Sequence, residues 1–451
     1  MAVDPTTLAF RFGYGLPTMA GAATDTAAMM ALLAGADDMA ALHKGIGFAA
    51  ASPLLTEVNK TRRAQKKDPA QQPAYKVAIA ASGNAAIANT QAGFARALDN
   101  PDSFRERLVR FWADHFSVTA KNRQEALLPG TLIEDAIRPN VTGRFSNMLQ
   151  AATLHPAMMI YLDQVLSVGP TSIAGKKRGR GLNENLAREL LELHSLGVNA
   201  GYSQTDVRQM AELLTGLSVD LPNGFMFDPR RAEPGAETVL GISYGGEGVA
   251  PILAALHDLA MRPETAGHIA RKLVVHFVSD TPDDALVAHV RAAYLKTGGD
   301  LMAVYAALLE HPGAWLEEAQ KARQPYDFIV ASLRAMGITG DALKQGGERP
   351  FRRFVIGPMQ VMGQAVQGPP GPDGWPEDVA AWINPQGLAA RINWAMDVPA
   401  RLSTELPDPT MLAKRALGSR ASERLLWAVA RAETEREGVG LVLASAEFNR
   451  R

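Results

Sequence analysis

Apolar residues recur every three or four positions along most of the chain, and this periodicity predicts amphipathic helices of about ten to twenty residues. Residue types that favour helix starts strengthen the prediction. Ser103 with Glu106, and Ser203 with Asp206, have the spacing of a capping box, in which each side chain binds the other residue's backbone N–H. Pro263 begins a further helix. The expected fold class is mainly α, a large helical assembly.

A small β-hairpin excursion interrupts the helical pattern. Residues 217–219 and 225–227 are strand-like and flank Pro222-Asn223-Gly224, which predicts a hairpin around an Asn-Gly turn. Residues 239–244 could add a strand. We expect one unit over residues 1–451, which could divide into lobes at 1–165, 166–340 and 341–451.

A proline- and glycine-rich loop is expected near the C-terminus. The segment Gly368-Pro369-Pro370-Gly371-Pro372-Asp373-Gly374-Trp375-Pro376 cannot be helical, because proline lacks the N–H that a helix needs. It should be an ordered loop that packs on the helices through Trp375 and Trp382.

Two predicted helices place a histidine within their apolar stripe. His194 lies four residues after Leu190, and His115 lies four residues after Phe111. Both imidazoles are therefore expected to point towards a core. The opposite face of the His194 helix is charged and has the spacing of an exposed salt-bridge ladder, formed by Glu184, Arg188 and Glu192.

A buried imidazole needs hydrogen-bond or metal partners for its ring nitrogens. One hypothesis is a shared catalytic or metal site, in which His115 and His194 bind a divalent metal or act as base, and Asp163 from another helix supplies a carboxylate. No H-E-x-x-H pattern supports it. The alternative is that both histidines are hydrogen-bonded core residues.

A basic stretch precedes the His194 helix and could form an anion site. It contains Lys176, Lys177, Arg178 and Arg180, and it leads to Asn183, a residue type that caps helix starts. Basic side chains beside free backbone N–H groups favour phosphate, sulfate or carboxylate. The stretch lacks the features of a P-loop, so a solvated loop is the alternative.

Composition narrows the classes of function. The 451 residues are 47% hydrophobic and 21% charged, with a net charge of −1, which gives no general attraction to nucleic acid or membranes. The absence of cysteine excludes disulfides and thiolate chemistry. The polar run 60–75 should be a solvated linker or an exposed helix end. No membrane span or signal peptide is visible, so a cytoplasmic protein is expected, or a periplasmic one if it is exported with a partner.

The chain resembles a bacterial family catalogued as domain of unknown function 1800. The resemblance rests on Arg107-Leu108-Val109-Arg110-Phe111-Trp112-Ala113-Asp114-His115-Phe116 and on segments 157–163, 183–197, 202–216, 270–273, 276–277, 374–376 and 382–384. The family implies no established activity. It does imply a partner, because its members are described beside proteins of another family, domain of unknown function 1501. Family members often have histidine where Ala113 stands here.

Together these observations lead to two hypotheses of function. The first is an enzyme or ligand-binding protein with a polar His/carboxylate pocket between the His115 and His194 helices, metal-dependent or not. The second is a non-catalytic partner or accessory protein whose buried histidines are structural.

Overall fold

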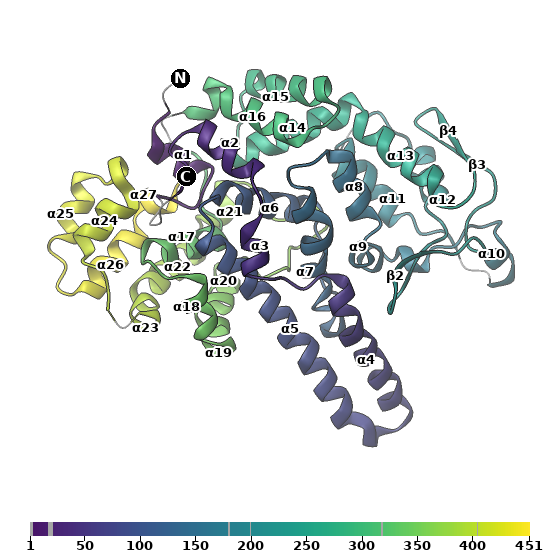
Figure 1. The fold of residues 1–451 in the computed structure, drawn as a ribbon, viewed down its shortest axis with the longest axis horizontal. Coiled ribbons are helices and arrows are strands. Elements are labelled where there is room, and N and C mark those ends of the chain that lie inside the picture. The colour runs from purple at the N-terminus through teal and green to yellow at the C-terminus, as the bar shows by residue number, and fades with distance from the viewer. Residues whose placement is uncertain (1–2, 17–20, 179–180, 199, 317–318, 404) are drawn as a thin grey trace.

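Helices form most of the part of the chain that the computed structural model describes, namely residues 3–16, 21–178, 181–198, 200–316, 319–403 and 405–451. The predicted mainly α class is confirmed. Figure 1 shows an elongated helical body from which a two-helix arm projects. In these residues no helix has both the length and the apolar character needed to cross a membrane. The chain begins with α1 (Pro5–Arg11), α2 (Thr26–Ala34) and α3 (Asp38–Leu42).

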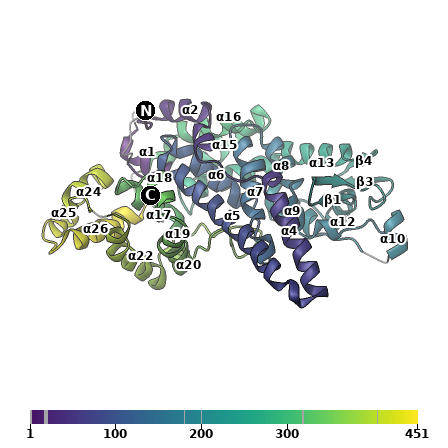
Figure 2. The same cartoon turned by 60° about the horizontal axis from the view of Figure 1, so that its bottom comes forward.

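The arm consists of α4 (Phe48–Lys67) and α5 (Gln72–Asp99), joined by the short 3-10 turn η1 (Pro69–Gln71). The two helices run side by side in Figures 1 and 2. Small buried residues on α5, including Ala78 and Ser82, allow the close approach of α4. The polar run 60–75 forms the far end of this arm, so the exposed helix end is the correct one of the two alternatives.

The body continues with α6 (Ser103–His115), α7 (Leu128–Leu132), α8 (Phe145–Thr153) and α9 (Pro156–Tyr161). Next come α10 (Ile173–Arg178), α11 (Asn185–Glu189), the π-helical turn η6 (Leu190–Ser195) and α12 (Gln204–Leu213). The helices α13 (Ala250–Met261), α14 (Pro263–Phe277), α15 (Asp284–Thr297) and α16 (Leu301–Glu310) follow the strands.

Capping explains two of these helix starts. At α12 the predicted capping box of Ser203 and Asp206 is confirmed. At α6 the predicted box is wrong, because Asp102 is the N-cap and its side chain accepts a hydrogen bond from the backbone N–H of Arg105. Glu106 instead accepts hydrogen bonds from the side chains of Asn100 and Arg138.

Two hairpins form the β excursion. The predicted one pairs β1 (Leu217–Asp220) with β2 (Gly224–Phe227) in antiparallel register and is confirmed. The second pairs β3 (Ala236–Val239) with β4 (Ile242–Gly245), so the single strand expected over 239–244 is wrong. Leu240 and Gly241 both have positive φ, 51° and 82°, as a two-residue type I′ turn requires.

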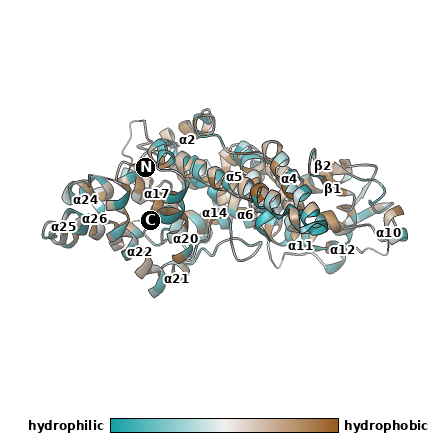
Figure 3. Ribbon diagram, turned by 90° about the horizontal axis from the view of Figure 1, so that it is seen from below, coloured by the Kyte–Doolittle hydropathy of each residue, from teal (hydrophilic) through white to brown (hydrophobic). Residues whose placement is uncertain are grey.

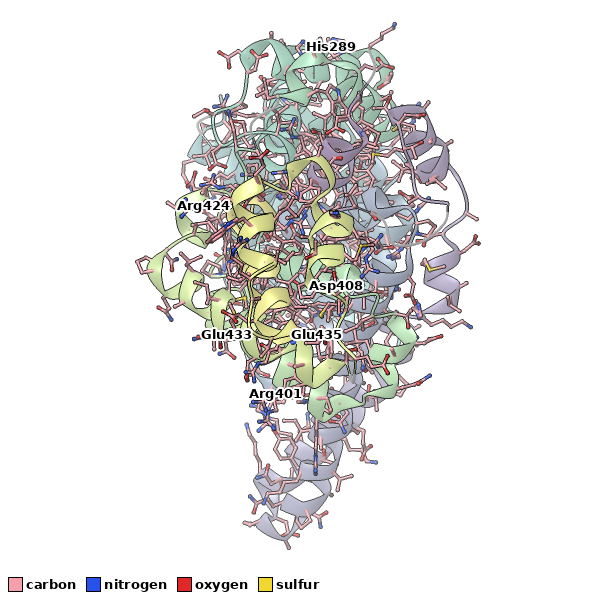
Figure 4. All side chains as sticks on the ribbon, turned by 90° about the vertical axis from the view of Figure 1, so that its left-hand side faces the viewer. His289, Arg401, Asp408, Arg424, Glu433 and Glu435 are labelled. Carbon is pink, nitrogen blue, oxygen red and sulfur yellow. The ribbon has the colours of Figure 1, made fainter. Side chains whose placement is uncertain are left out.

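The C-terminal part is helical, with α17 (Pro325–Ala335), α18 (Gly340–Gln345), α19 (Glu348–Phe351), α20 (Gly357–Val361), α21 (Val379–Trp382), α22 (Pro385–Asp397), α23 (Pro399–Leu402), α24 (Pro409–Leu417), α25 (Glu423–Val429), α26 (Glu435–Ala444) and α27 (Ala446–Asn449). Figure 4 looks onto this end, where Asp408 lies at the start of α24 and Glu435 at the start of α26.

Buried apolar side chains form two clusters. One gathers residues between Leu8 and Ala314, and the other combines the helices after residue 325 with parts of α1 and α5. Seen from below in Figure 3, hydrophobic and hydrophilic residues alternate along the helices, as expected for elements that bury one face. The helix α6 lies in the middle of the body and contributes to the first cluster.

Candidate functional site

The structure brings the two predicted histidines together. His115, the last residue of α6, and His194, in the π-helical turn η6, have ring centroids 6.2 Å apart, and each is 1% exposed. A third imidazole, that of His268 on α14, lies 6.1 Å from the His115 ring. These three side chains are called the histidine cluster below. Sequence reasoning missed His268, which lies on a helix separate from the other two.

Two of the three imidazoles hydrogen-bond the end of η6. Nε2 of His115 lies 3.2 Å from the carbonyl oxygen of His194, and Nε2 of His268 lies 3.0 Å from that of Leu193. Carbonyls in the last turn of a helix have no partner within the helix. The two rings donate Nε2–H to them, which fixes the tautomer of each histidine and holds η6 against α6 and α14.

Burial keeps the histidine cluster neutral. It lowers the pKa of His194 to about 3 and that of His268 to about 4, and the positive charge of Lys272 adds to both shifts. The pKa of His115 is also well below its usual value, for the same two reasons. None of these imidazoles carries a charge at neutral pH.

His194 differs from the other two in its hydrogen bonding. Both of its ring nitrogens are buried and have no hydrogen-bond partner within the described residues. Leaving a buried polar atom unpaired costs about 1–3 kcal/mol. Nδ1 of His115 is also buried without a partner, but Nε2 of His115 and of His268 is bonded, so packing explains these two better than it explains His194.

Asp163 pairs with a lysine and does not take the ligand role predicted for it. Its carboxylate, 42% exposed, forms an ion pair of 2.7 Å with Lys121, and its backbone is left-handed with φ 57°. Over the described ranges, no group of three or more His, Asp or Glu side chains is placed to hold a metal ion. The geometry thus offers two histidines but no third ligand from Asp163.

The predicted anion stretch is partly helical. Lys176 and Lys177 lie exposed on α10, so the solvated loop expected as the alternative is wrong for these residues. Arg178 ends α10, and Arg180 lies outside the described residues. Glu184 is the N-cap of the next helix, while the Asn183 side chain accepts from the backbone N–H of Asn185 at 2.8 Å. Anion binding by this stretch stays a prediction.

The charged face of α11 and η6 is a surface ladder. Arg188 forms ion pairs of 3.3 Å with Glu184 and with Glu192. All three side chains are between a quarter and two fifths exposed, so the predicted salt-bridge ladder is confirmed.

Next to His115 at the end of α6, the proline- and glycine-rich loop closes over Asp114. The backbone N–H of Trp375 donates to both carboxylate oxygens of Asp114, at 3.0 and 3.2 Å. Gly374 has φ 87°, and a Cβ there would lie 2.7 Å from the Asp114 carbonyl oxygen, so only glycine allows this approach. Trp382 donates its indole N–H to the Pro376 carbonyl, which confirms the expected packing of the loop.

Lys272 on α14 interacts electrostatically with the histidine cluster and with a group of carboxylates. It is half-buried and forms no ion pair with any residue the structure describes. Burial lowers its pKa, although the negative charges of Asp114, Glu377 and Asp373 oppose the change. Burial likewise raises the pKa of Asp114 to about 7, opposed by the Trp375 hydrogen bond and by Lys272. An amine with a lowered pKa and a carboxyl with a raised one are suited to exchange protons with a ligand.

His276, one turn after Lys272, is structural. Its Nδ1 lies 2.6 Å from Oε1 of Glu377, and its Nε2 lies 3.1 Å from the guanidinium of Arg107. Lys321 also pairs with Glu377, at 3.2 Å. These bonds tie α14 and α6 to the segment that follows the loop.

The comparison with protein families agrees with the motifs in this site. The family described as "Protein of unknown function (DUF1800)" matches residues 7–450, which include every residue of the site. The chain belongs to this family. No curated protein and no solved structure matches the chain.

In this DUF1800 protein α6 has two different faces. The inner face, with Phe111, Trp112 and His115, is buried against the first hydrophobic cluster. On the cavity face, a space of about 30 Å³ is bounded by residues that include Arg110, Asp114 and Trp375. The sequence held a signal for this second face, because Glu106, Arg110 and Asp114 are spaced by four residues.

Proposed function

We propose that this DUF1800 protein is an enzyme or ligand-binding protein that takes a small polar ligand in the cavity beside Asp114, where Lys272 interacts electrostatically with Asp114 and with the histidine cluster. The observation that carries the proposal is the closure of the proline- and glycine-rich loop over Asp114, in the wall of a cavity. A glycine with positive φ and two backbone hydrogen bonds hold that carboxyl in one orientation. Fixed orientation of an ionisable group is what catalysis and specific binding need.

Lys272 supplies the second group. Its half-buried side chain interacts with the charge of Asp114 and has no ion-pair partner in the described part of the chain. Lysines whose charge is disfavoured by burial serve as bases and nucleophiles in enzymes. The shift of the Asp114 pKa to about 7 supports a role as proton donor or acceptor.

The π-helical turn η6 supports a functional role for His194. Such turns occur frequently at functional sites, and the described residues contain two others, at Ile133–Ile137 and Arg352–Ile356. Here η6 carries an imidazole with two unpaired nitrogens, and the charge of Lys272 acts on it. His194 does not line the cavity beside Asp114, so its part in the proposed function is through its electrostatic interaction with Lys272.

The alternative function, a non-catalytic partner protein, is favoured by one observation. His115 and His268 donate to carbonyls of η6, as structural histidines do. A partner from the domain of unknown function 1501 family stays a prediction, as do the cytoplasmic and periplasmic locations.

The test is a thermal-shift screen of small polar metabolites with four variants. Asp114→Asn and Lys272→Met remove the proposed groups without changing side-chain size much. Asp341→Asn and Lys296→Met make the same changes at exposed positions on other helices. A compound that stabilises the wild type and both control variants, but neither site variant, supports the proposal. Compounds that stabilise all four variants equally contradict it.

The metal form of the hypothesis has its own measurement. Protein purified without chelators is analysed for bound metals, together with His115→Ala and His194→Ala. Near-stoichiometric metal that is lost in both variants would establish a shared metal site. Folded variants with unchanged metal content would assign both histidines to packing or to a metal-free ligand.

A further inference from the structure

A second cavity lies on the same face of α6, one helical turn closer to the N-terminus of that helix. Its volume is about 50 Å³, and Arg110 forms part of its wall as it does of the cavity beside Asp114. Residues from α5, α6, α17, α20 and the segment 365–367 line it. A cavity needs roughly 10–15 Å³ of such volume to hold a single water, and this one exceeds that minimum several-fold.

The charges around this cavity are paired, with one exception. Arg96 pairs with Glu134 at 2.8 Å, and Arg138 pairs with both Glu106 and Asp37. The guanidinium of Arg110 forms no ion pair or hydrogen bond with the residues that the structure describes. The charge of Arg110 acts on the Asp114 carboxyl one turn further along α6, but no described carboxylate forms an ion pair with it.

Arg110 is held in place without using its N–H groups. Its guanidinium carbon lies 4.5 Å from the centre of the Tyr326 ring, within the range of a cation–π contact. Such stacking occupies the face of the guanidinium and leaves its edge for a planar anion. The aromatic ring thus orients Arg110 for bidentate binding.

The amide of Gln367 lies at the same wall. Gln367 has a left-handed backbone, φ 49°, which is strained for a residue with a side chain. A Cβ at Gly130 would lie 3.2 Å from Nε2 of Gln367, so the glycine makes room for this amide. No hydrogen bond of the Gln367 side chain is found within the described ranges. It can donate to the same ligand.

The remaining wall is apolar. Phe94, Val109, Ile133, Met359 and Val366 contribute to it, and Phe94 and Met359 are at most 2% exposed. An inorganic anion would leave this surface unused. A hydrocarbon group of a few carbons would fill it.

We infer that this cavity binds a small aliphatic monocarboxylate, with its carboxylate on Arg110 and Gln367 and its hydrocarbon part against Phe94 and Met359. Phosphate fits less well, because a dianion would meet only one unpaired cation. This cavity shares Arg110 and Gln367 with the cavity beside Asp114, whereas Phe94 and Met359 line this one and not the other.

Butyrate is the probe, and isothermal titration calorimetry at constant ionic strength is the measurement. We expect one butyrate per chain, bound at least about tenfold more tightly than phosphate. Arg110→Met should weaken butyrate binding by about tenfold or more, because a charge-assisted pair is lost. Arg353→Met is the matched control: Arg353 also lies over an aromatic ring, that of Phe354, but it is exposed and outside the cavity.

A second variant fills the cavity and leaves Arg110 unchanged, so that a loss of binding can be told apart from an effect of Arg110→Met on folding. A Cβ at Gly93, in the cavity wall, would meet no atom within 4 Å, so Gly93→Leu can place its side chain at the cavity without a backbone clash at the Cβ. It should abolish binding without loss of thermal stability, since leucine favours a helix more than glycine does. Gly83→Leu is its control on the same helix, because a Cβ there also meets nothing within 4 Å.

Three results would overturn the inference: no butyrate binding by the wild type, unchanged binding by Arg110→Met or Gly93→Leu, or tighter binding of phosphate than of butyrate. Gly93 lines this cavity and not the one beside Asp114, so Gly93→Leu separates butyrate binding from the function proposed for Asp114. Failure of the function proposed for Asp114 would therefore leave butyrate binding intact, and loss of butyrate binding would leave that function standing.

Discussion

The two faces of α6 differ in what their polar residues do. On the inner face, His115 is 1% exposed and donates to the end of η6, so it is part of the packing. On the cavity face, Arg110 and Asp114 line cavities and neither forms an ion pair within the described residues. A histidine in an apolar stripe is the more conspicuous candidate in a sequence. In this helix, however, the charged residues Arg110 and Asp114 are the ones that remain available to a ligand.

The largest expected effect tests the inner face. His115→Ala should lower the free energy of unfolding by about 3–4 kcal/mol, because it leaves a cavity and an unpaired carbonyl at His194. Chemical denaturation followed by circular dichroism measures it. His289→Ala, at an exposed histidine on α15 that Figure 4 labels, should change stability by less than about 0.5 kcal/mol. A His115→Ala protein as stable as the control would show that the buried His115 does not stabilise the packing of α6 against η6.

The next prediction concerns the loop on the cavity face. Gly374→Ala should cost about 2–3 kcal/mol, because φ 87° is strained for alanine and its Cβ would collide with Asp114. Gly363→Ala provides the control. Gly363 has φ 98°, but a Cβ there would meet no atom within 4 Å, so its cost of about 1 kcal/mol is backbone strain alone. Equal losses for the two variants would show that the loop does not press on Asp114.

Much of this architecture could be predicted from the sequence, since helices, the first hairpin and the loop arise from local patterns. The Asp102 cap and the π-helical turn η6 could not be predicted in this way. A shift of one residue in the hydrogen bonding leaves the apolar periodicity of the sequence almost unchanged. The candidate site was harder still to predict from the sequence. Asp114, Lys272 and Trp375 are about a hundred or more residues apart in the chain, and no spacing rule relates them. Only the packing of α14 and the loop on α6 makes them neighbours.

A pH series compares the two faces directly. The pKa of His194 is about 3 in the folded chain and about 6.5 when unfolded, so the unfolded chain takes up the proton and stability falls as the pH drops below 6.5. Asp114 contributes to the pH dependence of stability with the opposite sign. Its pKa of about 7 in the folded chain exceeds the usual value of 3.8. The folded chain therefore holds the extra proton, and its stability increases as the pH falls from about 7.

Asp114→Asn should therefore make the loss of stability between pH 6.5 and pH 5 steeper, by up to about 1.4 kcal/mol per pH unit. His194→Phe should make the loss shallower by a similar amount. Denaturant unfolding of both variants and the wild type at three pH values measures the slopes. Three equal slopes would show that neither group has its shifted pKa in the folded protein.

The smallest effect is expected at the surface ladder, which belongs to neither face of α6. Arg188→Ala removes two ion pairs, yet it should cost only about 0.5 kcal/mol, because exposed pairs are screened and their side chains lose freedom. Arg208→Ala removes a single exposed pair with Glu212 and should cost less still. Neither variant should alter butyrate binding or the pH slopes. If Arg188→Ala cost as much as His115→Ala, the charged side of η6 would hold the turn in place, and the hydrogen bonds from His115 and His268 would no longer explain it.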